Sequence, residues 1–164
     1  MRSIAVLFGA AALVAGCAHP WNSMNVPPGA SREDVIAHAG QPVGVIPLAG
    51  GGQRLQYTLQ PMGYYAFMVD LDPTGHVVQT RQVMTPQEFL RIQDNVWTRD
   101  DVVREFGPPA KIDTVASWNG PIWQYRWYEP GQGPMFWYVY FDPQGVVRRA
   151  HPAIEFFNGP ADRH

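Results

Sequence analysis

The side chains able to bind a metal ion or act as nucleophiles are scattered along this sequence. Its five histidines are His19, His38, His76, His151 and His164. No two of them stand at the spacing of zinc ligands. The acidic stretch 70–75 lacks the later glutamate of a calcium loop, the glycine-rich stretch 49–53 lacks the lysine of a phosphate-binding loop, and Ser117 has no histidine nearby in the sequence. We therefore expect no catalytic residue, no metal site and no cofactor, and predict that the protein is not an enzyme.

Cys17 is the one side chain whose sequence context indicates a defined chemistry. It follows a basic Arg2 and an apolar run, 4–15, which is shorter than the roughly 20 residues of a membrane span and is typical of a signal peptide. Residues 13–17, Leu-Val-Ala-Gly-Cys, resemble a bacterial lipobox, in which the cysteine sulfur receives the lipid. The alternative, an ordinary secretory signal followed by a chance cysteine, is weaker because the chain has 1 cysteine, at this position.

The resemblance to bacterial lipoproteins implies cleavage before Cys17 and attachment of acyl chains, palmitate among them, to the new N-terminus. Two or more acyl chains anchor a protein stably in a membrane. Lipidated Cys17 would leave no thiol for a disulfide or a metal. Ala18 follows it, where aspartate usually signals inner-membrane retention in Gram-negative lipoproteins. The resemblance therefore implies the periplasmic face of the outer membrane.

The composition of the chain is typical of a small folded protein. Its 164 residues carry a formal charge of −2, with 46% hydrophobic and 16% charged residues. This length suits one compact domain or two very small ones, and the apolar content is high enough for a packed core. The near-neutral charge argues against a nucleic-acid-binding protein, which needs a basic face.

Two helices are predicted at corresponding places in the two halves of the chain. Ser31 and Thr98 are N-cap residues, each followed three positions later by an aspartate that completes a capping box. The helices end at Gly40 and Gly107, each followed by a proline two positions on. The offset from Ser31 to Thr98 is 67 residues. Thr85, followed by a proline at the first helical position, predicts a further helix between the copies.

Strands and turns repeat in the same order after these helices. Alternating residues begin at Leu55 in one copy and at Trp123 in the other, an offset of 68. The turns Asp72–Gly75 and Asp142–Gly145 are both Asp-Pro-x-Gly, a type I turn signature, at an offset of 70. Ordered landmarks at similar offsets indicate an internal duplication with small loop insertions.

The predicted fold class is α+β, with two tandem modules, each a short helix or a helix pair packed on a three-stranded antiparallel β-meander. The predicted segments are a signal peptide (1–16), a lipidated tether (17–28), module 1 (29–83), module 2 (84–157) and a C-terminal tail (158–164).

The pattern of each module resembles the BamE/SmpA/OmlA family of small outer-membrane lipoproteins. The family motif is a helix cap, a valine inside the short helix, a Gly-x-Pro stop, a Trp-x-Tyr strand and a last hairpin turn. The matching residues are Ser31, Val35, 40–42, Leu55 and Tyr57 in copy one, and Thr98, Val102, 107–109, Trp123 and Tyr125 in copy two. Two tandem copies are similar to β-lactamase-inhibitor protein, in which two such modules form one concave sheet. The resemblance implies a lipid-anchored envelope protein that supports outer-membrane protein assembly.

Copy two also contains more aromatic residues than one buried sheet face requires. The motif places Trp123, Tyr125, Val139 and Phe141 against the helices. The opposite face then carries five residues, which we call the aromatic face: Arg126, Tyr128, Phe136, Tyr138 and Tyr140. Tyrosine and arginine are enriched in protein-binding surfaces, so these five are the candidate partner-binding residues. The alternative is that this face packs against the other module.

These observations favour a lipid-anchored periplasmic protein-binding module of the outer membrane that supports outer-membrane protein assembly or envelope integrity. The partner would be an envelope protein; neither a nucleic acid nor a small-molecule substrate is indicated. Two alternatives stay open. One is a structural envelope lipoprotein that binds lipid headgroups or peptidoglycan, and the other is an inhibitor-like module that blocks an envelope enzyme.

Overall fold

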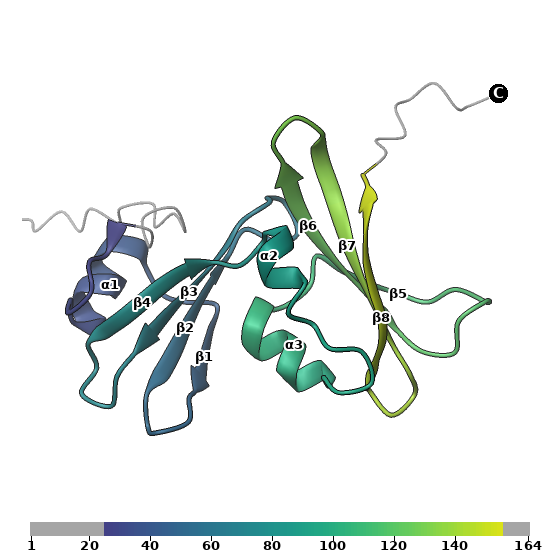
Figure 1. The fold of residues 1–164 in the computed structure, drawn as a ribbon. Helices are drawn as coiled ribbons and strands as arrows, with labels where there is room; N and C mark the ends of the chain where they lie inside the picture. The colour runs from purple at the N-terminus through teal and green to yellow at the C-terminus, as the bar shows by residue number, and fades with distance from the viewer. Residues whose placement is uncertain (1–24, 156–164) are drawn as a thin grey trace, which may run out of the picture.

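The computed structural model describes residues 25–155, which form an α+β fold with two four-stranded antiparallel sheets (Figure 1). The first sheet contains β1 (Gly44–Pro47), β2 (Gln53–Thr58), β3 (Ala66–Leu71) and β4 (Val77–Gln82). The second contains β5 (Lys111–Asp113), β6 (Ile122–Glu129), β7 (Gly133–Phe141) and β8 (Val147–Ile154). The helices are α1 (Arg32–Ala39), α2 (Pro86–Phe89) and α3 (Arg99–Phe106). In both sheets the strands lie side by side in chain order.

Each sheet has four strands, so the expectation of three-stranded meanders was wrong. The additional strands are β1 and β5, which pair with β2 and β6 at one edge of each sheet. They are 4 and 3 residues long, and their central apolar residues, Val45 and Ile112, are exposed. Such short edge strands lack the buried alternation by which a strand is recognised in a sequence.

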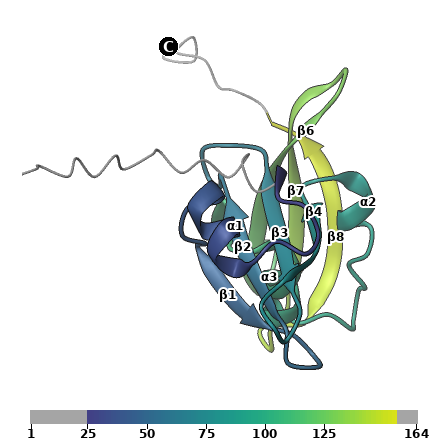
Figure 2. The same ribbon diagram turned by 90° about the vertical axis from the view of Figure 1, so that its left-hand side faces the viewer.

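The two sheets and the helices form successive layers. One core contains Val35 of α1 together with Leu55 and Tyr57 of β2, so α1 covers one face of the first sheet. In Figure 2 this helix lies in front of that sheet. The other core joins Met68 of β3 to Phe89 of α2, Phe106 of α3 and the buried aromatic residues of the second sheet. Helices α2 and α3 therefore lie between the two sheets (Figure 1).

This layering differs from the single concave sheet that the likeness to β-lactamase-inhibitor protein implied. The eight strands form two separate sheets with no strand pairing between them among residues 25–155. The inner face of the first sheet is occupied by α3 instead. The Gln56 side chain donates a 2.7 Å hydrogen bond to the Val103 carbonyl, and Arg54 forms a 3.0 Å ion pair with Glu105.

The helix ends follow the capping chemistry that the sequence indicates. Ser31 begins α1 and Thr98 begins α3, each with a complete capping box, and Gly40 and Gly107 end these helices at φ of 80° and 76°. Positive φ is accessible to glycine because it has no Cβ atom. Thr85 caps α2, which is a single turn; the Glu88 carboxylate pairs with arginines instead of completing a capping box.

Several contacts recur in both halves of the fold. The Tyr57 hydroxyl donates a 2.9 Å hydrogen bond to the Gly40 carbonyl, and Tyr125 makes the same 2.9 Å bond to Gly107. Both Asp-Pro-x-Gly turns close with a 3.0 Å bond from the glycine N–H to the aspartate carbonyl. The tyrosine bonds join each helix to its own sheet, and the turn bonds close the last hairpin of each sheet, β3–β4 and β7–β8.

No helix within residues 25–155 is long and apolar enough to cross a membrane. The signal segment 1–16 and Cys17, with the tether up to residue 24, lie outside the described residues, as does the tail from residue 156.

Candidate functional site

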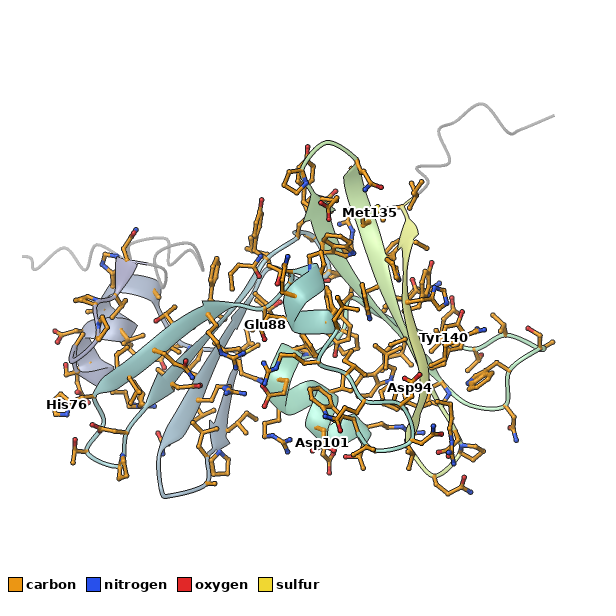
Figure 3. All side chains as sticks on the ribbon, viewed as in Figure 1. His76, Glu88, Asp94, Asp101, Met135 and Tyr140 are labelled. Carbon is orange, nitrogen blue, oxygen red and sulfur yellow. The ribbon has the colours of Figure 1, made fainter. Side chains whose placement is uncertain are left out.

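The second sheet has one face against α2 and α3 and one face directed away from them, which we call the outer face. Along β7, Trp137, Val139 and Phe141 are buried, whereas Phe136, Tyr138 and Tyr140 alternate with them and are partly exposed. Figure 3 shows Tyr140 on the side of this sheet that lies away from α2 and α3. The period of two along a strand therefore separates these rings from the core, as the sequence predicts.

Arg126 does not belong to an exposed patch, because it binds the first half of the chain. Its guanidinium donates to the Pro61 carbonyl at 2.8 Å and to the Tyr64 hydroxyl at 2.9 Å, and it pairs with Glu155 at 2.7 Å. The Gln60 side chain also bonds to both the N–H and the carbonyl of Arg126. Its side chain is only 15% exposed. Here the alternative interpretation, packing against the other half, describes the structure.

Tyr128 lies at the margin of the same contact. Its ring is 6.0 Å from that of Tyr64, and the residue is 46% exposed. With Trp127, Tyr65 and Met84 it lines a groove of about 410 Å³ between the two halves. Arg126 and Tyr128 thus form one end of the outer face, where the Gln60–Tyr64 loop meets the second sheet.

The other three residues of the aromatic face form a continuous row of rings. Ring centroids are 5.8 Å apart between Phe136 and Tyr138, and 6.5 Å apart between Tyr138 and Tyr140. Trp118, from the loop before β6, meets Tyr140 edge-on at 5.3 Å and donates a hydrogen bond to the Phe141 carbonyl. Sequence reasoning missed Trp118, because nothing in the loop sequence indicates that it folds back over β7.

Two basic residues of β8 lie against this row. The Arg149 guanidinium is 4.1 Å from the Tyr140 ring centroid and 5.8 Å from that of Trp118. The His151 ring stacks on Tyr140 at 5.4 Å. Strand pairing places Arg149 beside Tyr140 and His151 beside Tyr138. The sequence signal for both was the alternation along β8, which puts residues 149 and 151 on the same face.

The charges of the outer face leave a positive excess at Arg149. Lys111 pairs with Asp113 at 2.6 Å and Arg126 with Glu155, whereas Arg149 has no carboxylate within ion-pair distance among residues 25–155. Burial is the main reason that the pKa of Tyr138 is raised, so its phenol is neutral at physiological pH. The face therefore offers ring surfaces, hydroxyl groups and a cation, which suit binding of a partner with negative charge.

A second cluster, of buried charges, lies between α3 and the first sheet. Arg54 binds Asp70 at 2.6 Å and Glu105 at 3.0 Å, and Arg81 binds Glu105 at 3.3 Å and Glu88 at 2.6 Å. Burial alone would raise the pKa of Asp70 and Glu105, but the hydrogen bonds and charge of Arg54 outweigh it and hold both below their usual range. The same pairs raise the pKa of Arg54 against the effect of burial. This cluster holds the two halves together.

Neither cluster has the side chains of a metal centre. Among the described residues, no group of three or more His, Cys, Asp or Glu is placed to hold a metal ion. The Asp72 carboxylate instead accepts hydrogen bonds from the N–H groups of Thr74 and His76 inside its own turn.

Comparison with known proteins adds little to this description. No protein-family model matches the chain, and no curated protein matches it. A crystal structure of a DUF4309 family protein (YjgB) from Bacillus subtilis subsp. subtilis str. 168 is similar over 77% of this chain and 79% of that chain. The sequence identity is 15% and the TM-score is 0.31, a likeness too weak to indicate a shared fold or function.

Proposed function

We propose that this protein is a lipid-anchored, periplasmic protein-binding module of the outer membrane that supports outer-membrane protein assembly or envelope integrity. The observation that carries the proposal is the row Phe136, Tyr138 and Tyr140, which no helix covers within residues 25–155. The inner face of the same sheet already supplies its core. Aromatic residues that are not needed for packing and that remain accessible are typical of protein-binding surfaces.

We further propose that the two halves are tandem copies of one module related to the BamE/SmpA/OmlA family, with boundaries at 29–83 and 84–157. The bonds from Tyr57 to Gly40 and from Tyr125 to Gly107 support this proposal, because the donors are 68 residues apart and the acceptors 67. The matched capping boxes at Ser31 and Thr98 support it as well.

The proposed location rests on the lipobox at residues 13–17 and on Ala18. An anchored protein is confined near the membrane, so even a weak binding face can meet membrane partners at a high effective concentration. The lipid therefore supports the binding proposal as well as the location.

A second candidate function is favoured by Arg149, which lacks a carboxylate partner in residues 25–155. A structural envelope lipoprotein could use such a cation to bind anionic lipid headgroups. The inhibitor-like alternative stays open, although no observation on the described residues favours it over the other two.

Site-specific photo-crosslinking in the native envelope tests the proposal. A photoreactive phenylalanine at Tyr138 should yield a discrete protein adduct, whereas the same group at Val78, which is 57% exposed on the first sheet, should not. Lipid adducts alone at position 138 would favour headgroup binding, and no adduct at all would remove the protein-binding proposal for this face.

The anchor is tested in the same cells with Cys17→Ser. This variant should remain unprocessed, should take up no labelled palmitate and should lose the position-138 adduct if anchoring brings the two proteins together. Normal processing and outer-membrane fractionation of Cys17→Ser would show that the lipobox interpretation is wrong.

A further inference from the structure

The first sheet shows how one copy of this fold binds the C-terminal end of a helix. Gln56 donates hydrogen bonds to the carbonyls of Val103 and Arg104, at 2.7 and 3.3 Å, in the last turn of α3. Arg54 donates to the Arg104 carbonyl at 3.1 Å and pairs with Glu105 at 3.0 Å. The last carbonyls of a helix have no intrahelical partner and carry the negative end of its dipole. Amide and guanidinium donors therefore stabilise this helix end.

The outer face of the second sheet occupies the equivalent place in the second copy. In the first sheet, strand pairing forms the rows Gln56–Met68–Arg81 and Arg54–Asp70–Gln79. The equivalent rows in the second sheet are Gln124–Tyr138–His151 and Ile122–Tyr140–Arg149. A glutamine occupies the first position of the first row in both sheets. His151 takes the place of Arg81 and Ile122 takes that of Arg54, whereas Arg149 stands in the neighbouring row, at the place of Gln79.

The two equivalent faces differ in what covers them. Helix α3 covers the first face, and Met68 packs against its end. Gly107 has no Cβ atom, but one added there would lie in van der Waals contact, 3.6 Å from the Met68 Cε. Over Tyr138, Tyr140 and His151 there is no helix among residues 25–155. The amide of Gln124 donates instead to Asp113, at a long 3.3 Å.

We propose that the outer face of the second sheet binds the C-terminal end of a helix of a partner protein, and that this helix carries a carboxylate in its last turn. The inference rests on the proposed protein-binding function and names the partner's chemistry. The rings of Tyr138 and Tyr140, which stand at the places of Met68 and Asp70, supply the contact area. Arg149 supplies the cation that meets the helix dipole and the carboxylate.

Charge argues that the occupant is a different protein rather than a second copy of this chain. The exposed helix that a second copy could offer is α1. At the position that corresponds to Glu105 in α3, α1 carries His38. A histidine there offers Arg149 no carboxylate, so a second copy lacks the negative charge that Glu105 supplies in the first interface.

A titration with the chain's own α3 as a probe tests the inference. Residues 96–107, prepared as a helix-stabilised peptide, are added to the isotope-labelled full-length chain in detergent micelles, and amide chemical shifts are followed. Shifts should saturate at Gln124, Tyr138 and Arg149. The peptide should bind about three- to tenfold more tightly than its Glu105→Gln counterpart, the range of one charged contact. Arg149→Gln in the protein should abolish this preference.

Several results would overturn the inference. Shifts away from the outer face, or equal affinity of the two peptides, would each do so. Concentration-dependent shifts of these amides without any peptide would identify a second copy as the occupant. Shifts that appear only after residues 156–164 are removed would identify the chain's own terminal segment. Binding to anionic vesicles that Arg149→Gln removes, with no peptide binding, would also overturn it in favour of lipid headgroups. If the Tyr138 crosslink captures a protein while the peptides show no preference, the helix-end inference fails and the protein-binding proposal remains.

Discussion

A single hydroxyl group joins each longer helix to its sheet. Tyr125 is fully buried, and its hydroxyl satisfies the Gly107 carbonyl at the end of α3. Burial raises the pKa of Tyr125 well above its usual range and that of Tyr57 to about 12. Both phenols therefore remain hydrogen-bond donors throughout the physiological range, and the two bonds keep the same geometry in both halves.

We expect Tyr125→Phe to lower the free energy of unfolding by about 1–3 kcal/mol, because the Gly107 carbonyl loses its donor inside the core. Urea unfolding measures this loss. Tyr128→Phe, on an exposed ring, is the matched control and should change stability by less than about 0.5 kcal/mol. Equal effects of the two variants would show that the buried hydrogen bond contributes no net stability.

The sequence predicts the direction of many side chains but not their distant contacts. Alternation along β7 placed Tyr138 opposite Val139 correctly, because successive side chains of a strand point to opposite faces. The same alternation grouped Arg126 with Tyr138. It contains no information about Gln60 and Tyr64, which lie more than 60 residues earlier and occupy Arg126 in the fold.

Local chemistry made the helix boundaries predictable, while the edge strands were missed. Capping boxes and terminal glycines act over three to four residues, so Ser31, Thr98, Gly40 and Gly107 could be identified from the sequence. Strands β1 and β5 depend on pairing with β2 and β6 instead. Their own residues carry little strand signal, which is why the sequence predicts only three strands in each module.

The N-cap of α3 is expected to matter beyond its own helix, because α3 packs between the two sheets. Thr98→Ala removes the side chain that accepts from the Asp101 N–H and should lower stability by about 1 kcal/mol. Thr98→Ser keeps the acceptor and should retain most of that stability. Thermal unfolding of the two variants makes the comparison; an alanine variant as stable as the serine variant would contradict the assigned role of the cap.

At the scale of the whole molecule, the buried charges between α3 and the first sheet add to the apolar core around Met68 in joining the layers. Arg54 and Asp70 are 16 residues apart in the chain, and Arg54 and Glu105 are 51 apart. The alternation of residues along a strand cannot indicate that Arg54 forms ion pairs with side chains so distant in the sequence. The sequence contains one trace of this packing: Asp70 interrupts the otherwise apolar strand β3, both faces of which are buried.

We expect Arg54→Met to destabilise the protein strongly at neutral pH. The Asp70 and Glu105 side chains are only 8% and 12% exposed, so loss of Arg54 would leave Asp70 without a paired cation, whereas Glu105 would keep Arg81 at 3.3 Å. Breaking a buried pair by removing one partner costs about 3–5 kcal/mol. Lys111→Met is the control, because Lys111 is 61% exposed in its pair with Asp113, and surface pairs contribute about 0–1 kcal/mol.

The effect of Arg54 should also depend on pH in a defined direction. Asp70 and Glu105 have folded-state pKa values below their ordinary values of 3.8 and 4.5. A lowered folded pKa contributes stability that is complete above the ordinary value and is lost as the pH falls through the folded value. The difference between wild type and Arg54→Met should therefore be largest at neutral pH, and it should begin to fall above the ordinary pKa values, because burial without Arg54 raises the carboxyl pKa in the variant. It should shrink at lower pH, since protonated carboxyl groups no longer need a cation. Urea unfolding at each pH measures the difference, and one that stays constant down to about pH 3 would mean that packing of the Arg54 side chain, rather than its charge, joins the two halves.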